Sequence, residues 1–377
     1  MSQMSIEDEV LLENEEELNE LEYFGDEEKP IFESVRVTKK DFSIYELYRK
    51  YKKLILEVDF QRNEVWGPKQ KCELIESILM GLPLPIFYFK QQNNSTYVVV
   101  DGKQRLSTLF DFLSDGFPLK SLKILKFLNG KKFKNLVDEL GIYQSQLEDY
   151  QVYSHVILPP TPDKILFDIF DRVNRGGTKL NKQEIRNALY HGRGLNMITE
   201  VVASQEFLQA TRIEYKKDRR MKGSYLVTRF LAFYLFFNDL LFKDGKKYEY
   251  TGNLDDLIET TLTKLNQSSL EELEEIRQVT IKSLEMARDI LGKGAFRKEN
   301  NESKPINMNI FETTLYFMTL LPKNNIAVSR EELLEKIKTV ISSEEFLYYI
   351  GNSRDNTMKV YGRFQLMEKL CKEISDD

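Results

Sequence analysis

The stretch best suited to chemistry is residues 101–105, where both signs of charge, an amide and a glycine stand together. It consists of Asp101, Gly102, Lys103, Gln104 and Arg105. Three valines before it predict a buried strand, and the apolar residues after it have the spacing of one helix face. A helix N-terminus presents unpaired N–H groups and partial positive charge, so this junction predicts an anion site, most often for phosphate.

The side chains of this turn suggest separate roles. Arg105 can clamp a phosphate through two parallel hydrogen bonds, and Asp101 can hold a metal or a water. The turn is not a Walker A loop, because the pattern GxxxxGK[ST] is absent. The alternative, which the sequence leaves open, is that Arg105 pairs with a neighbouring aspartate and braces the turn.

Two further loops carry residues that fit the same site. Residues 59–62 follow an expected strand and contain Asp59 and Arg62. Two arginines and two aspartates near one helix N-terminus can bind a triphosphate with its Mg²⁺, which Asp101 or Asp59 would hold. Residues 174–179 form a polar loop that can fold over the site and add Asn174, or simply end a helix at its glycines.

The charge of the chain is divided unevenly. Its 377 residues have a net charge of −6, but residues 1–30 hold twelve acidic residues and one lysine. The remaining residues hold 53 basic and 48 acidic side chains and are mildly basic. We expect the leader, residues 1–30, to be a disordered acidic tail; the alternative is an arm that competes with nucleic acid for a basic surface.

The predicted elements favour an α+β protein. Strands and helices alternate over residues 31–160, and residues 161–377 have a helical pattern throughout. No apolar run approaches the ~20 residues that cross a bilayer, and no secretory signal is visible. We therefore expect no membrane contact. Two distant cysteines favour a reduced, cytoplasmic protein.

Four stretches, in the same order, resemble the sequence boxes of one family. Residues 59–66 resemble its P-x-F-Q-R-x-Y-V-W box, and residues 74–84 its L-I-E-S-I-L-x-G-x-P-I helix. Residues 100–109 resemble its I-D-G-Q-Q-R-L-x-T-L signature, and residues 170–180 its F-x-R-I-N-x-G-x-x-L box. The family is the N-terminal domain of GmrSD-type restriction endonucleases, and the resemblance covers about residues 30–240.

The resemblance implies a ParB/sulfiredoxin-like N-terminal domain that binds nucleotide at the DGQQR turn, followed here by an all-helical domain. In some members this domain hydrolyses NTP and couples hydrolysis to sensing of phage or modified DNA. The residues carried over are Asp101, Gly102, Gln104 and Arg105 from the signature, and Gln61 and Arg62 from the first box. We therefore predict catalytic roles for Asp101, Gln104 and Arg105.

Two departures from the family pattern bear on these roles. Lys103 stands where the signature has glutamine, which preserves phosphate binding, and Asp59 stands where the first box has proline. The metal role of Asp59 therefore rests on its own chemistry alone. The two histidines of the chain form no cluster that resembles the family's His-Asn-His nuclease. We therefore expect this chain alone not to cut DNA by that chemistry, and we expect a separate nuclease subunit as a partner.

Three functions follow from these observations. The first is a nucleotide-binding protein, with Mg²⁺ and NTP as ligands, that hydrolyses NTP and acts as sensor or specificity subunit in DNA defence. The second is a DNA-binding or DNA-nicking protein that uses the same turn on backbone phosphate. The third is a non-catalytic scaffold whose aromatic helices bind a partner protein.

Overall fold

The computed structural model describes most of the chain in two compact units. The described residues are 12–13, 36–50, 54–55, 66–92, 96–159, 169, 181–218, 220–321 and 328–376. Contacts group residues 22–180 into one unit, here the α/β unit. Residues 181–377 together with residues 1–21 form the other, here the helical unit. Each unit is described by itself.

A mixed five-stranded sheet forms the centre of the α/β unit. The strands are β1 (Arg36–Ser43), β2 (Leu54–Ile55), β3 (Phe87–Gln91), β4 (Tyr97–Asp101) and β5 (Gln151–Leu158). Their order in the sheet is β1-β5-β3-β4-β2, with β5–β3 and β4–β2 parallel and the other two pairs antiparallel. The three valines of β4 are all buried, as the valine run predicts.

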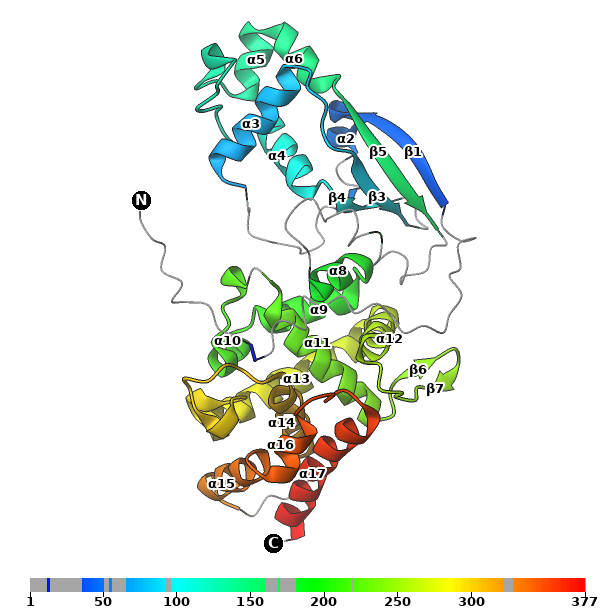
Figure 1. Cartoon of the computed structure of the whole chain (residues 1–377), viewed down its shortest axis with the longest axis vertical. Coiled ribbons are helices and arrows are strands. Elements are labelled where there is room, and N and C mark those ends of the chain that lie inside the picture. Colours follow the sequence, from blue (N-terminus) through cyan, green and yellow to red (C-terminus); the bar gives the residue numbers. More distant parts are fainter. Residues whose placement is uncertain are drawn as a thin grey trace. The chain divides into compact units, whose positions relative to one another are not determined.

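Short helices cover this sheet. They are α2 (Ile44–Arg49), α3 (Pro68–Leu79), α4 (Lys103–Leu113), the 3₁₀ turn η3 (Lys126–Leu128), α5 (Phe133–Glu139) and α6 (Gly141–Glu148). Figure 1 shows α3 beside α4 and α6. Residues 117–150 form η3, α5 and α6 and no strand. The buried Glu76 carboxylate accepts the amides of Lys123, Ile124 and Leu125 and fixes the bend before η3.

The helical unit consists of ten described α-helices, three 3₁₀ turns and a short hairpin. The α-helices are α8 (Lys182–Leu189), α9 (Arg193–Val202), α10 (Gln205–Thr211), α11 (Lys222–Phe237), α12 (Leu254–Gln267), α13 (Leu270–Leu291), α14 (Met308–Leu320), α15 (Arg330–Ile341), α16 (Glu344–Tyr349) and α17 (Thr357–Asp376). The shorter elements are η4 (Tyr215–Lys217), η5 (Gly292–Gly294), η6 (Lys298–Asn300), β6 (Phe242–Lys243) and β7 (Lys246–Lys247). The apolar helices α11 and α14 are buried over most of their length and form the core.

These two units confirm the α+β fold class, with a helical C-terminal part. The finer likeness to ParB and sulfiredoxin stays a prediction. Within the described ranges, no helix is long and apolar enough to span a membrane.

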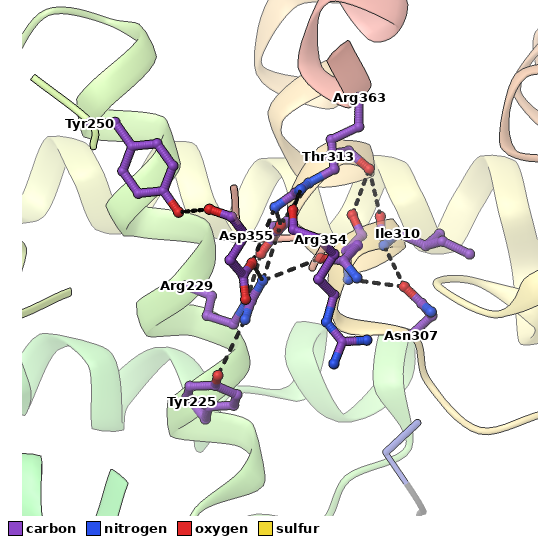
Figure 2. A network of polar contacts seen from close by, with 11 residues as sticks. Tyr225, Arg229, Tyr250, Asn307, Ile310, Thr313, Arg354, Asp355 and Arg363 are labelled. Atoms are coloured by element: carbon purple, nitrogen blue, oxygen red, sulfur yellow. Dashed lines mark hydrogen bonds and ion pairs between the residues drawn. The ribbon is translucent and has the colours of Figure 1, made fainter. Parts of the chain in front are cut away.

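A buried ion cluster holds α11, α14 and α17 together (Figure 2). Glu312 accepts hydrogen bonds from Arg229 Nε and Arg363 Nη2, each at 2.8 Å, and all three side chains are buried. Asp355 lies 3.2 Å from Arg229 Nη2. Burial alone would raise the pKa of Asp355, but Arg229 and Arg363 outweigh it, so the pKa is lowered. The Asp355 carboxylate is therefore charged at neutral pH.

Candidate phosphate site at the β4–α4 junction

The junction between β4 and α4 is built around Gly102. Its backbone is left-handed, with φ at +101°, and it is the N-cap residue of α4. A Cβ atom at this position would lie 2.3 Å from Phe87 Cδ1, a distance that no side chain tolerates. Only glycine therefore meets both the backbone and the packing requirement at this turn.

The start of α4 suits an anion. Gly102 provides no side-chain cap, and the first turn of the helix carries no acidic residue. The first hydrogen bond within the helix runs from Leu106 N to Gly102 O, at 2.9 Å, so helix geometry leaves the amides before Leu106 directed out of the N-terminus. Lys103 and Gln104 are half-buried on this turn. A phosphate placed here would meet amide dipoles and a lysine, and the one carboxylate of the turn, that of Asp101, precedes the helix and is ion-paired.

Arg105 makes its contacts with the protein itself. Its Nη2 donates to Asp101 Oδ2 at 2.8 Å and to the carbonyl of Ile86 at 3.4 Å, and its Nη1 donates to the carbonyl of Pro85. The guanidinium carbon lies 4.1 Å from the centre of the Phe87 ring. This geometry is the brace that the sequence left open as the alternative to a phosphate clamp.

Burial and charge act in opposite directions on this arginine. Arg105 is 8% exposed, and burial lowers its pKa, while the Asp101 carboxylate opposes that shift only in part. The guanidinium remains charged, since arginine is not deprotonated in proteins. Asp101 keeps 31% of its side-chain surface exposed, so its carboxylate remains accessible to water or an ion.

The structure brings together five of the predicted site residues, those of the turn 101–105. The other predicted residues, Asp59, Gln61, Arg62 and Asn174, lie outside the described residues. Among the described residues, no group of three or more histidine, cysteine or acidic side chains could hold a metal. Asp101 alone still fits Mg²⁺, because this ion is commonly held by one or two carboxylates together with substrate phosphates.

Sequence reasoning missed three residues that shape the junction. The carbonyls of Pro85 and Ile86 bind Arg105, and the ring of Phe87 supports it. The one signal was the Leu-Pro-Leu-Pro run at residues 82–85, since an extended proline-containing segment presents carbonyls without internal partners.

Residues 44–191 match a family model described as "GmrSD restriction endonuclease, N-terminal domain". This region is a GmrSD N-terminal domain. The match confirms the predicted resemblance and supports a role in a restriction-like defence system. No curated protein and no solved structure is significantly similar to the chain.

The GmrSD N-terminal domain contains the whole β4–α4 junction and also helix α8. Helix α8 begins with a capping box: Asn181 Oδ1 accepts from Glu184 N at 2.8 Å, and Glu184 Oε2 accepts from Asn181 N at 2.6 Å. Buried Arg186 of α8 pairs with Asp255 of α12. The family domain therefore ends in a helix that is part of the helical unit.

Proposed function

We propose that the GmrSD N-terminal domain binds the phosphates of a nucleotide at the β4–α4 junction. In this proposal the protein is the NTP-hydrolysing sensor or specificity subunit of a restriction-like defence system. The observation that carries the proposal is the start of α4, where left-handed Gly102 brings the backbone to a helix N-terminus whose first turn has no acidic side chain. The family match supports the restriction-like setting.

Each residue of the turn has a distinct role in this proposal. The amides at the start of α4 and the Lys103 ammonium bind phosphate oxygens. Asp101 holds Mg²⁺, which would neutralise phosphate charge when bound, and Gln104 orients the attacking water. Arg105 positions Asp101 through the 2.8 Å ion pair and keeps its carboxylate at the mouth of the turn. The roles of Gln61, Arg62, Asp59 and Asn174 remain predictions from the sequence.

Calorimetric titration of the full chain with ATP and with GTP, each with Mg²⁺, tests nucleotide binding. The variant Lys103→Glu should bind the preferred nucleotide at least about tenfold more weakly, which is ~1.4 kcal/mol. The matched control is Lys120→Glu, which makes the same charge change at an exposed lysine outside the turn. Absence of binding to the wild type, or equal weakening in both variants, would contradict the proposal.

Hydrolysis is tested separately from binding. Phosphate release is measured with and without added DNA for the wild type and for Asp101→Ala. We expect release by the wild type and its loss in Asp101→Ala, with nucleotide affinity measured in parallel. Binding without release in the wild type would leave a sensor that holds nucleotide and would refute the hydrolase part of the proposal.

A second candidate function, DNA binding, is favoured by one observation in the α/β unit. Lys120, Lys123 and Lys126 are exposed, and Phe127 beside them is 57% exposed and touches Tyr143. Lysines interleaved with an exposed aromatic ring suit contact with phosphates and bases. This function predicts DNA affinity that falls steeply with salt, and a flat salt dependence would count against it.

A further inference from the structure

Two residues of the acidic leader, Leu12 and Glu13, lie against the helical unit. Leu12 forms a parallel bridge with Ile306, and Glu13 N donates to Ile306 O at 2.8 Å. Leu12 is 5% exposed. On its other side, Ile306 forms an antiparallel bridge with Arg297. Leu12 thus pairs by one bridge with an existing backbone edge, nearly three hundred residues further along the chain.

The Glu13 carboxylate is bound at both of its oxygens. Lys298 Nζ donates to Oε1 at 2.5 Å, and Asn307 Nδ2 donates to Oε2 at 2.8 Å. Burial alone would raise the pKa of Glu13, but these two hydrogen bonds and the charges of Lys298 and Arg354 outweigh it, so the pKa is lowered. The surroundings of Glu13 therefore favour the ionised carboxylate over the protonated one.

Of the two groups that receive the carboxylate, the Asn307 amide is held in place by the helical unit itself. Asn307 Oδ1 accepts the amides of Asn309 and Ile310, each at 3.0 Å, which caps α14 and turns Nδ2 toward Glu13. Figure 2 shows Asn307 and Arg354 in the same polar network as the buried ion cluster. The Asn307 side chain is thus oriented by bonds that do not involve the leader.

The backbone edge is also fixed independently of the leader. Arg297 is 3% exposed and donates to the carbonyls of Lys304 at 3.0 Å, Ala295 at 2.8 Å and Thr211 at 3.2 Å. These bonds tie the segment before Ile306 to the end of α10. A rigid edge with oriented donors costs little ordering free energy when a ligand binds.

We propose that the edge at Ile306 is a binding site for an extended peptide in which an apolar residue is followed by a carboxylate. The chain's own Leu12–Glu13 occupies it. Main-chain pairing at an edge, with pockets for successive side chains, is the general mode of strand addition. Here Ile306 provides the backbone edge, and the buried position of Leu12 receives the apolar side chain. Lys298 and Asn307 bind the carboxylate that follows it. The site fastens the acidic leader to the helical unit and makes it exchangeable for a peptide of the same chemistry.

Fluorescence anisotropy with a labelled peptide of residues 7–18 tests this site on full-length protein. In the variant Glu13→Lys the chain's own leader is repelled from Lys298, so the site is vacated and the peptide should bind. The wild type should bind it at least about tenfold more weakly, because the tethered leader competes at high effective concentration. Adding Lys298→Glu to Glu13→Lys should abolish binding, whereas adding Lys369→Glu, an exposed charge change on α17, should not.

A second measurement follows the leader without any peptide. The Glu13 amide donates to Ile306 O, so its hydrogen exchange should be slow in the wild type and faster in Lys298→Glu. Lack of peptide binding to Glu13→Lys, or equal binding after Lys298→Glu and Lys369→Glu, overturns the binding site. An unchanged Glu13 amide in Lys298→Glu overturns its occupation by the leader.

Discussion

Replacing Arg105 with alanine removes the side-chain contacts that tie the start of α4 to Asp101 of β4 and to the segment before β3. The substitution breaks the 2.8 Å ion pair with Asp101 and the hydrogen bonds to the carbonyls of Pro85 and Ile86. It also removes the cation from the face of Phe87. If Arg105 is a brace, this loss should lower the stability of the α/β unit in the absence of any nucleotide.

The size of the loss follows from these contacts. A hydrogen bond to a charged group contributes ~1.5–3 kcal/mol, and a partly desolvated cation over an aromatic ring ~0.5–2 kcal/mol. Asp101 is 31% exposed, and solvent screening reduces the share of its ion pair. We therefore expect Arg105→Ala to lower the free energy of unfolding by about 3 kcal/mol. Asp101→Asn keeps an acceptor but loses the charge, so its cost should be about 1–2 kcal/mol.

Urea unfolding followed by tryptophan fluorescence measures this effect. Trp66 is the one tryptophan of the chain and packs against the core of the α/β unit, so its signal reports that unit. The control Arg49→Ala removes an exposed arginine from the same unit and should change stability by no more than about 0.5 kcal/mol. If Arg105→Ala unfolds at the same urea concentration as the wild type, the brace is refuted.

Three further predictions concern other parts of the fold. Gly102→Ala should lower the free energy of unfolding, measured by Trp66 fluorescence, by about 2–5 kcal/mol, because of left-handed backbone strain and the clash with Phe87. The control is Gly130→Ala, where φ is +85° and no atom lies within 4 Å of the added Cβ. This control should lose only the strain term of about 1–2 kcal/mol. Glu312→Gln leaves two buried arginines short of a carboxylate and should cost about 3–5 kcal/mol in thermal unfolding followed by circular dichroism. The lowered pKa of Asp355 stabilises the folded state at pH values above 3.8, the ordinary aspartate pKa, and this stability is lost as the pH falls through the lowered pKa. The variant Asp355→Asn lacks this contribution, so its loss of helix with falling pH should be shallower than that of the wild type.

The sequence predicts the β4–α4 junction well because its signals are local. A valine run, a glycine and the change to helical spacing all stand within a few residues, and each determines the conformation of its own segment. The capping box at Asn181 is predictable for the same reason. The partners of Arg105 are not, because the carbonyls of Pro85 and Ile86 approach it only when β3 pairs with β4 in the sheet.

The same distinction explains the contacts that the sequence does not predict. The bend at residues 123–125 is held by Glu76, from a distant helix, which accepts three of its amides. The leader carries no local sign that Leu12 and Glu13 pair with Ile306, since the edge and the donors belong to residues far along the chain. Local patterns thus predict turns and helix caps. The partners of charged side chains depend on contacts between distant segments, which local patterns do not show.

Backbone hydrogen exchange at the start of α4 tests the central claim most directly. If phosphate binds there, saturating nucleotide with Mg²⁺ should slow exchange of the Lys103 and Gln104 amides. The start of α3 is the internal control, because it also follows a glycine N-cap and has no acidic residue in its first turn. The account predicts slowing at α4 and none at α3. Nucleotide binding that leaves the α4 amides unchanged, or slows both helices equally, would contradict it.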